Sequence, residues 1–332
     1  FADLLDRMER PDSGIRTGLP TLDTQLGGLE PGDLMYLCGR PGSGKSALGV
    51  TLATAIARRF RAQWQERQRE RVDPATGAVL AADPPETLPE HVDIVTLEMR
   101  QLQQVRRIVA AATSVNTRVL KAAFRRSNGS VDVEGYQTVK ARAYADKETL
   151  ARTLHIDERP TTLENLRSKV LTAVATRRTS VVLIDQIDLF NEEPAPGRRR
   201  EADETERISR FSRMLKQLAN EANVIIVCLA QLNRNVESRQ NKRPMLSDLR
   251  SSGRLEQDAD IVLGLYRGAY YDGARARKEP NFAQFAELGL LKVRESEANV
   301  MVPLRYEGAF TRFSEWPEDW EWPADETRGM ER

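Results

Sequence analysis

The chain has 332 residues, of which 30% are charged and 40% are hydrophobic, and its formal net charge is +1. A charge so close to balance excludes a globally basic nucleic-acid binder, so any contact with nucleic acid must come from a local patch such as a loop or a channel. No apolar run approaches the ~20 residues of a membrane span and no signal peptide is visible, so we expect a cytoplasmic protein without a membrane partner.

Residues 1–10 predict a short amphipathic helix with Phe1, Leu4, Leu5 and Met8 on one stripe. A helix this short is marginal alone, so it must pack on something. A polar break follows from residue 11 to residue 18. The helix therefore packs either on its own chain or on a neighbouring subunit, and the residues alone favour neither.

A phosphate-binding loop is predicted between an apolar strand at residues 34–38 and an apolar helix at residues 47–57. The loop fits the pattern G-x-x-x-x-G-K-[ST] and comprises Gly39, Arg40, Pro41, Gly42, Ser43, Gly44, Lys45 and Ser46. In this setting backbone N–H groups surround phosphates, Lys45 reaches the outer phosphates, and the Ser46 hydroxyl binds Mg²⁺. The sequence thus predicts a nucleoside triphosphate site. The strand and a later apolar run also hold the two cysteines, Cys38 and Cys228, which we expect to be reduced core thiols.

The remaining elements alternate along the chain. Residues 63–91 are polar, rich in Arg and Pro, and predict an exposed insertion that could hold a small hairpin. Helices are expected at residues 99–112, twice within 116–150, from a capping box at 161–164 to 175, and from a basic loop at 191–200 to 221. Strands are expected at residues 93–96, 154–156, 181–185, 224–229 and 261–266, with an antiparallel finish at 285–293, 299–306 and 309–313. This order predicts an α/β fold with a mainly parallel sheet and helices on both faces.

Three polar residues follow predicted strands and are candidates for triphosphate chemistry. Asp185 ends an apolar strand and is expected to lie near Mg²⁺, because ligand sites gather at the carboxyl edge of such sheets. Glu98 follows another strand and suits a general base acting on water, although Glu is also a common residue at a helix start. Gln231 can sense the outer phosphate without repelling it.

Positive charge for the transition state has several candidate sources. Arg250 and the pair Lys292 and Arg294 are the plausible cations. A basic stretch formed by Arg234, Arg239, Lys242 and Arg243 could follow a nucleic-acid backbone, but composition alone favours an ordinary charged loop.

Together these segments resemble the C-terminal motor domain of DnaB-type replicative DNA helicases, which have a RecA-like fold. The matching segments run in the family's order over nearly the whole chain. They are Thr17-Gly-Leu-Pro-Thr-Leu-Asp23, Arg40-Pro-Gly-Ser-Gly-Lys-Ser46, Leu97-Glu-Met99, Leu183-Ile-Asp185, Gln231-Leu-Asn-Arg234, Arg243-Pro-Met-Leu-Ser-Asp-Leu-Arg250, Gly253-Arg-Leu-Glu-Gln-Asp-Ala-Asp260 and Lys292-Val-Arg294.

The resemblance implies a homo-hexamer that hydrolyses ATP with Mg²⁺, translocates 5′ to 3′ on single-stranded DNA and unwinds duplex at the fork. Under it, Glu98 is the catalytic base, Gln231 couples the γ-phosphate to DNA, and Lys292 and Arg294 reach a neighbour's ATP. The DNA contact in the central pore is implied at Arg250, Ser251, Ser252 and Gly253. Residues 1–16 would be a linker helix on the next subunit, 17–320 the motor domain and 321–332 a polar tail. Primase and a helicase loader are candidate further partners.

The chain departs from the family pattern in four places. Ser251 stands where the family usually has Glu, and Glu295-Ser296 stand where it usually has Asn-Gly, which places a carboxylate beside Arg294. The 63–91 insertion is long for the family, and the family's separate N-terminal domain is not among these residues. Two other functions stay open: a recombinase-type or clock-type ATPase of the same fold, and a catalytically weakened scaffold that binds ATP.

Overall fold

The computed structural model describes residues 14–68, 71–72, 79–80, 88–125, 129–159, 162–186, 200–249, 252–294 and 300–323. The predicted linker helix at 1–10 therefore lies outside the described residues. So do most of the predicted loop at 191–200, the residues Arg250, Ser251 and Glu295, and the end of the predicted tail.

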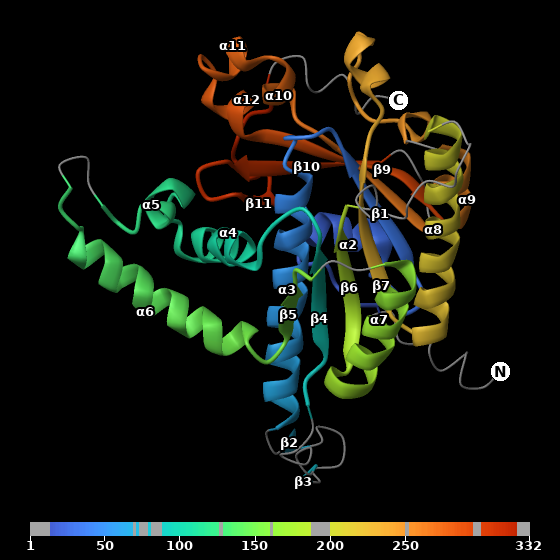
Figure 1. Ribbon diagram of the computed structural model, residues 1–332. Coiled ribbons are helices and arrows are strands. Elements are labelled where there is room, and N and C mark those ends of the chain that lie inside the picture. Colours follow the sequence, from blue (N-terminus) through green and yellow to red (C-terminus); the bar gives the residue numbers. More distant parts are fainter. Residues whose placement is uncertain are drawn as a thin grey trace.

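A nine-stranded mixed sheet organises the chain, in the order β11-β10-β9-β8-β1-β7-β6-β4-β5 (Figure 1). The strands from β8 to β5 run parallel, whereas β9, β10 and β11 run antiparallel. Their bounds are β1 Leu34–Gly39, β4 His91–Thr96, β5 Leu154–Asp157, β6 Thr179–Asp185, β7 Ile225–Gln231, β8 Ile261–Tyr266, β9 Phe285–Val293, β10 Val300–Glu307 and β11 Arg312–Glu315. The predicted parallel sheet with an antiparallel finish is confirmed.

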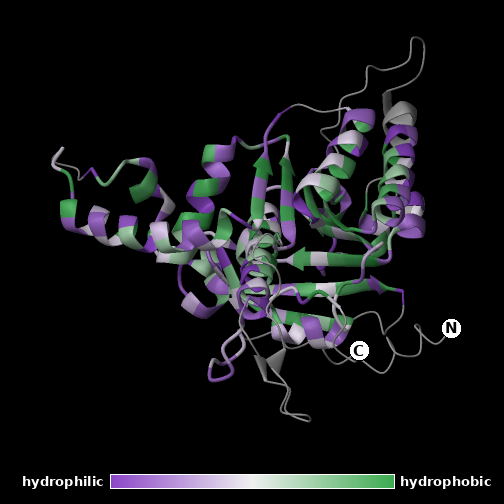
Figure 2. Cartoon of the chain, turned by 90° about the horizontal axis from the view of Figure 1, so that it is seen from below, coloured by the Kyte–Doolittle hydropathy of each residue, from purple (hydrophilic) through white to green (hydrophobic). Residues whose placement is uncertain are grey.

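The central strands are apolar because both of their faces are covered. Successive side chains of β1 alternate between two cores: Met35 and Leu37 belong to one, and Leu34, Tyr36 and Cys38 to the other. All of them are buried. A parallel strand buried on both faces needs this continuous apolar run. Seen from below, the hydrophobic residues concentrate in the strands while the helices are mixed (Figure 2).

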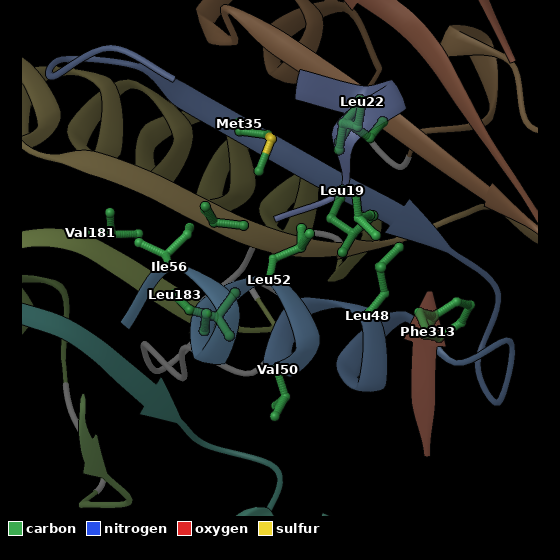
Figure 3. Close-up of a cluster of buried hydrophobic side chains, with 14 of the residues drawn as sticks. Leu19, Leu22, Met35, Leu48, Val50, Leu52, Ile56, Val181, Leu183 and Phe313 are labelled. Carbon is green, nitrogen blue, oxygen red and sulfur yellow. The ribbon is translucent and has the colours of Figure 1, made fainter. Parts of the chain in front are cut away.

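Helices α3, α4 and α6 contribute side chains to one core, and α7, α8 and α9 to the other. On α3, Leu48, Leu52 and Ile56 point to the sheet, with Ile56 beside Val181 of β6 (Figure 3). The bounds are α2 Pro20–Leu26, α3 Lys45–Arg67, α4 Gln101–Thr113, α5 Thr117–Lys121, α6 Val133–Leu150, α7 Leu163–Arg177, α8 Arg200–Ala222, α9 Ser252–Asp258, α10 Gly268–Tyr271, α11 Gly273–Ala276 and α12 Pro280–Gln284. None of the helices in these ranges is long and apolar enough to cross a membrane.

Helices α5 and α6 form an arm that extends away from the sheet (Figure 1). Both helices attach the arm: α6 packs on α3 and α4, and α5 packs on α4. An ion pair between Arg58 and Asp146, 2.9 Å long, ties it to α3. Most of the exposed large hydrophobic side chains of the described residues lie on α4 and on this arm. They are Leu102, Val105, Val119, Val131, Val133, Tyr136 and Tyr144. Such a concentration of apolar surface is typical of an interface.

Two expectations about local structure need correction, and a third is confirmed. The helix after the phosphate loop runs on to Arg67, so the start of the predicted 63–91 insertion is helical. Within that insertion the expected hairpin is present as β2 Arg71–Val72 and β3 Val79–Leu80. The cap of α7 is Thr162, whose hydroxyl accepts the Asn165 N–H at 3.3 Å, so the cap lies one residue later than the predicted box. Helix α2 and the short helices α10 to α12 were not predicted.

Candidate active site at the carboxyl edge of the sheet

The phosphate loop connects β1 to α3 and is held open for an anion by its backbone. Gly44 precedes α3 with a φ of 104°, and no side chain caps the first turn of this helix. The Leu48 N–H is the one that returns to the Gly44 carbonyl, at 2.9 Å. The N–H groups before it have no intrahelical partner, so the start of α3 offers donors and a positive dipole end to a phosphate. The predicted residues Gly39 to Ser46 thus form one continuous cradle.

Ser46 and Asp185 place two side-chain oxygen atoms next to each other beside the loop. The Ser46 hydroxyl donates to Asp185 Oδ1 at 3.1 Å, and Asp185 is 1% exposed. Burial raises the pKa of Asp185, Glu98 raises it further, and the nearby Lys45 opposes both. A buried carboxylate and a hydroxyl at this spacing are hard oxygen donors, and Mg²⁺ prefers such ligands. The residues present therefore fit Mg²⁺.

Glu98 is held at the same edge by a turn and by an amide. The Thr96 hydroxyl donates to the Met99 carbonyl at 3.0 Å and accepts the Met99 N–H at 3.2 Å, which fixes the turn that carries Glu98. The Gln186 side-chain amide donates to Glu98 Oε2. Gln186 has a φ of 74°, an uncommon backbone for a residue other than Gly. Glu98 itself is exposed, so a water molecule can reach its carboxylate.

Gln231 ends β7 directly opposite Gly39, the first residue of the loop. Its side chain is half-buried. The strand order explains why these residues meet: β1, β7, β6 and β4 are consecutive neighbours, and each ends at this edge. Four separate strand ends therefore supply Lys45 and Ser46, Gln231, Asp185 and Glu98.

Lys292 and Arg294 lie at the other end of the strands, where β1 and β8 begin. The Lys292 Nζ donates to the Glu256 and Ala259 carbonyls, each at 2.6 Å, at the end of α9. The Arg294 guanidinium donates to Asp260 Oδ1 at 2.8 Å and its side chain is 66% exposed. This edge is far from the phosphate loop of the same chain, so neither cation joins the other predicted residues within one subunit.

The predicted DNA contact is only partly described. Arg250 and Ser251 lie outside the described residues, Ser252 opens α9, and Gly253 is exposed in its first turn.

Two cations of the basic stretch are neutralised inside the chain. Arg239 pairs with Asp248 and Arg243 with Glu287, each at 2.6 Å. The sequence-based alternative of an ordinary charged loop is thus the better description of these two.

Several polar groups around the loop were not predicted from the sequence. The amide of Gln104, fully buried on α4, donates to Asp185 Oδ2 at 3.3 Å. Arg267, just after β8, donates to the Ser43 carbonyl at 3.2 Å and stacks on the Tyr306 ring, with 4.0 Å between guanidinium carbon and ring centroid. Burial lowers the pKa of Arg267. The long apolar run of β8 signalled a strand end at Arg267, whereas nothing local marked Gln104.

The geometry supports metal-assisted phosphoryl transfer to water. The loop and Lys45 would hold phosphates, Ser46 and Asp185 would hold the cation, and Glu98 faces solvent on the same side. Within one chain, Lys292 and Arg294 lie at the other end of the strands, so they cannot meet the charge that develops on the transferred phosphoryl group of that chain.

Comparisons with known proteins identify one family that this chain matches. Residues 14–315 match the family described as "DnaB-like helicase C terminal domain". The chain is 31% identical over 268 residues to the replicative DNA helicase DnaB of Rickettsia bellii, covering 80% of this chain and 47% of that protein. It is 30% identical over 273 residues to the DnaB of Geobacillus stearothermophilus, covering 81% and 51%. The chain thus spans about half the length of these relatives.

Two solved structures share the fold at 27% identity and a TM-score of 0.74. One is described as an ATPase domain, matched over 95% of this chain and 97% of that chain. The other is described as a DnaB-like replicative helicase and its interactions with primase, matched over 95% of this chain and 66% of that chain.

Proposed function

The chain belongs to the DnaB-like helicase C-terminal domain family, and from that premise we propose that it is the ATP-driven motor of a ring helicase that moves along single-stranded DNA. One observation carries the proposal. The groups that bind and hydrolyse a triphosphate meet at one edge of the sheet, whereas Arg294 is exposed at the other. A site divided in this way becomes complete when subunits follow one another head to tail, and such contacts form a ring when the rotation between subunits closes.

Within one subunit, different residues bind the phosphates, hold the metal ion and activate the water. Lys45 and the start of α3 neutralise the outer phosphates, and Ser46 and Asp185 would hold Mg²⁺. The ion supplies charge for the transferred phosphoryl group. Glu98 orients the attacking water and takes its proton, with Gln186 fixing the carboxylate. Gln231 lies opposite Gly39, where it can distinguish ATP from ADP by the outer phosphate.

Between subunits, Arg294 of one chain would reach the phosphates bound by the next. To do so its guanidinium exchanges Asp260 for phosphate, which a side chain 66% exposed can do without disturbing the core. Lys292 binds two carbonyls at the end of α9, so we propose that it fixes this part of β9 in the single subunit and contacts phosphate only on assembly.

The apolar surface on α4 and the arm supports assembly. Residues 1–10 carry a predicted apolar stripe of Phe1, Leu4, Leu5 and Met8, which needs an apolar surface to be stable. We propose that this stripe packs on the exposed hydrophobic side chains of a neighbour's α4, α5 and α6. The single strand would then pass the segment from Arg250 to Gly253, which follows β7 in the chain.

Arg267 and Tyr306 extend the proposed nucleotide site. Their stacked planar groups lie beside the loop, because Arg267 contacts the Ser43 carbonyl. A flat cationic and aromatic surface is suited to the base of the nucleotide.

The proposal is tested by ATP turnover of the chain with and without an unstructured single-stranded oligonucleotide, over protein concentrations that span assembly. We expect turnover per chain to rise with concentration and with added single strand. Turnover that is concentration-independent and unaffected by DNA contradicts a ring motor, and tight ATP binding without turnover favours a scaffold. Filaments on DNA in place of rings, seen by electron microscopy, favour a recombinase-type ATPase. Primase and a loader are proposed partners by family membership.

A further inference from the structure

Arg40 is a buried cation inside the phosphate loop, and its guanidinium donates hydrogen bonds to the segment after β7. It is 6% exposed. Its Nη1 donates to the Leu232 carbonyl at 2.7 Å, and its Nε donates to Glu237 Oε1 at 2.9 Å. A second guanidinium nitrogen, Nη2, lies 2.8 Å from the same carboxylate oxygen. The charge of Arg40 is thus matched by Glu237, which leaves Lys45 as the loop cation for phosphate.

Leu232 connects this contact to the segment that precedes the predicted DNA contact. Its N–H donates to the Gly39 carbonyl at 3.3 Å, and it forms an antiparallel bridge with Leu249. The next N–H, of Asn233, donates to the Asp248 carbonyl at 2.7 Å. Leu249 directly precedes Arg250 in the chain. Two backbone contacts therefore link the first residues of the phosphate loop to the start of the predicted DNA contact.

The link is packed on both sides, so it can transmit a displacement. Leu232 and Val236 are fully buried and Leu249 is 2% exposed. Asp248 is fixed by Arg239. Closely packed interiors deform little, so a shift of the loop that moves Arg40 must also move Leu232 and its partner.

We infer that the ion pair between Arg40 and Glu237 is a positioning device that couples the state of the phosphate loop to the affinity for single-stranded DNA. This inference rests on the proposed function and adds to it a connection that does not pass through the Gln231 side chain. Glu237 is not among the residues proposed to bind phosphate or Mg²⁺. Its side chain is 45% exposed whereas that of Arg40 is 7% exposed, so the variant must keep a hydrogen-bond acceptor for the buried guanidinium, and the amide oxygen of Glu237→Gln provides one.

The test uses Glu237→Gln, which keeps the shape of the side chain and removes its charge. Glu221→Gln is the matched control. Glu221 has a similar side-chain exposure of 44% and also pairs with an arginine, Arg167, which is 49% exposed; it lies at the end of α8, before β7 begins. The measured quantity is the coupling factor, the ratio of the Kd for an oligo-dT strand without and with a non-hydrolysable ATP analogue and Mg²⁺.

We expect Glu237→Gln to reduce the coupling factor by about 2- to 30-fold, with basal ATP turnover unchanged. Coupling between two ligands is reciprocal, so the effect of oligo-dT on the Kd of the analogue must fall by the same factor. In a double-mutant cycle, the double variant should lose no more coupling than Arg40→Gln alone, because replacing Arg40 already breaks the ion pair. Glu221→Gln should keep the wild-type factor.

An unchanged coupling factor in Glu237→Gln overturns the inference, as does an equal loss in Glu221→Gln. The wild-type chain separates this failure from failure of the proposed function. If its coupling factor is 1 or it does not bind oligo-dT, the motor proposal itself is wrong.

Discussion

Arg294 and Lys45 lie at opposite ends of the same parallel strands. The Arg294 N–H donates to the Asp260 carbonyl, and the Asp260 N–H donates to the carbonyl of Leu34, the first residue of β1. Lys45 follows the loop at the other end of β1, which ends at Gly39. Five residue steps of about 3.3 Å place these ends about 16 Å apart. The rigid sheet therefore keeps Arg294 away from the phosphates of its own chain.

The shared site predicts complementation between two inactive variants. Lys45→Ala removes phosphate binding but keeps Arg294, and Arg294→Ala keeps the loop but removes the finger. Each alone should lose about 10²-fold or more of DNA-stimulated turnover, the scale of removing one transition-state charge. When the two are mixed, an Arg294→Ala loop next to a Lys45→Ala subunit regains a complete site, so we expect turnover to recover in part.

A matched mixture controls this experiment. Lys45→Ala and Glu98→Gln both damage the half of the site that binds ATP, and both keep Arg294. Every interface in this mixture therefore contains a damaged ATP-binding half. We expect no recovery there. Equal recovery in both mixtures, or none in either, would contradict a finger supplied by the neighbour.

The chemistry at strand ends could be predicted from the sequence because its signals are local. An apolar run followed by a polar residue marks a strand end, and this pattern located Asp185, Glu98 and Gln231 before their spatial order was known. Helix α2 carries local signals as well, with Pro20 at its first position and Gly27 after its end.

The supporting contacts could not be predicted because they join distant parts of the chain. Gln104 meets Asp185 across 81 positions, and Arg40 meets Glu237 across 197. Nothing near either residue in sequence distinguishes it from a surface amide or cation. Likewise, pairing of Arg239 and Arg243 with buried carboxylates was visible only once β9 and the turn at residues 246–248 were placed.

Gln186 should act on Glu98 without contacting the nucleotide. In Gln186→Asn the backbone at φ 74° is tolerated, because Asn accepts this region, but the shorter amide no longer reaches Glu98. We expect kcat to fall about 5- to 20-fold from loss of one orienting hydrogen bond, with the Kd for ATP unchanged. Steady-state turnover and equilibrium nucleotide binding separate the two. A loss confined to binding would assign Gln186 to the nucleotide instead.

We expect Gly44→Ala to lower the free energy of unfolding more than Gly27→Ala, although both glycines have a positive φ. A Cβ at Gly44, with φ 104°, would lie 3.1 Å from the Phe313 ring, whereas a Cβ at Gly27, with φ 70°, would meet nothing within 4 Å. Gly27→Ala should cost about 1 kcal/mol from backbone strain alone. We expect Gly44→Ala to cost at least about 1 kcal/mol more and to weaken ATP binding, because the loop must shift. Urea unfolding and nucleotide titration of both variants measure this, and equal costs would show that Phe313 yields freely.

The lowered pKa of Asp260 predicts how the free energy of unfolding depends on pH. Burial alone raises the pKa of Asp260, but hydrogen bonds from the Leu34 N–H, Lys216 and Arg294 together outweigh it and hold the pKa below its usual value. Because the folded-state pKa lies below the unfolded value of 3.8, the stabilisation is fully present above pH 3.8 and is lost as the pH falls toward the folded-state pKa. Asp260→Asn removes the charge and nearly keeps the shape. At pH 7 we expect it to lower the free energy of unfolding by about 2 kcal/mol, because charged hydrogen bonds are replaced by weaker ones.

The difference between the wild-type protein and Asp260→Asn should then shrink below pH 3.8, as the wild-type carboxyl takes up a proton and comes to resemble the amide. Urea unfolding of both proteins at several pH values from 7 down to 3 measures it. Arg294→Gln is the control, since its exposed side chain should contribute less than about 1 kcal/mol to the same carboxylate. A difference that stays constant down to pH 3 would mean that the Asp260 charge is not what the three donors stabilise.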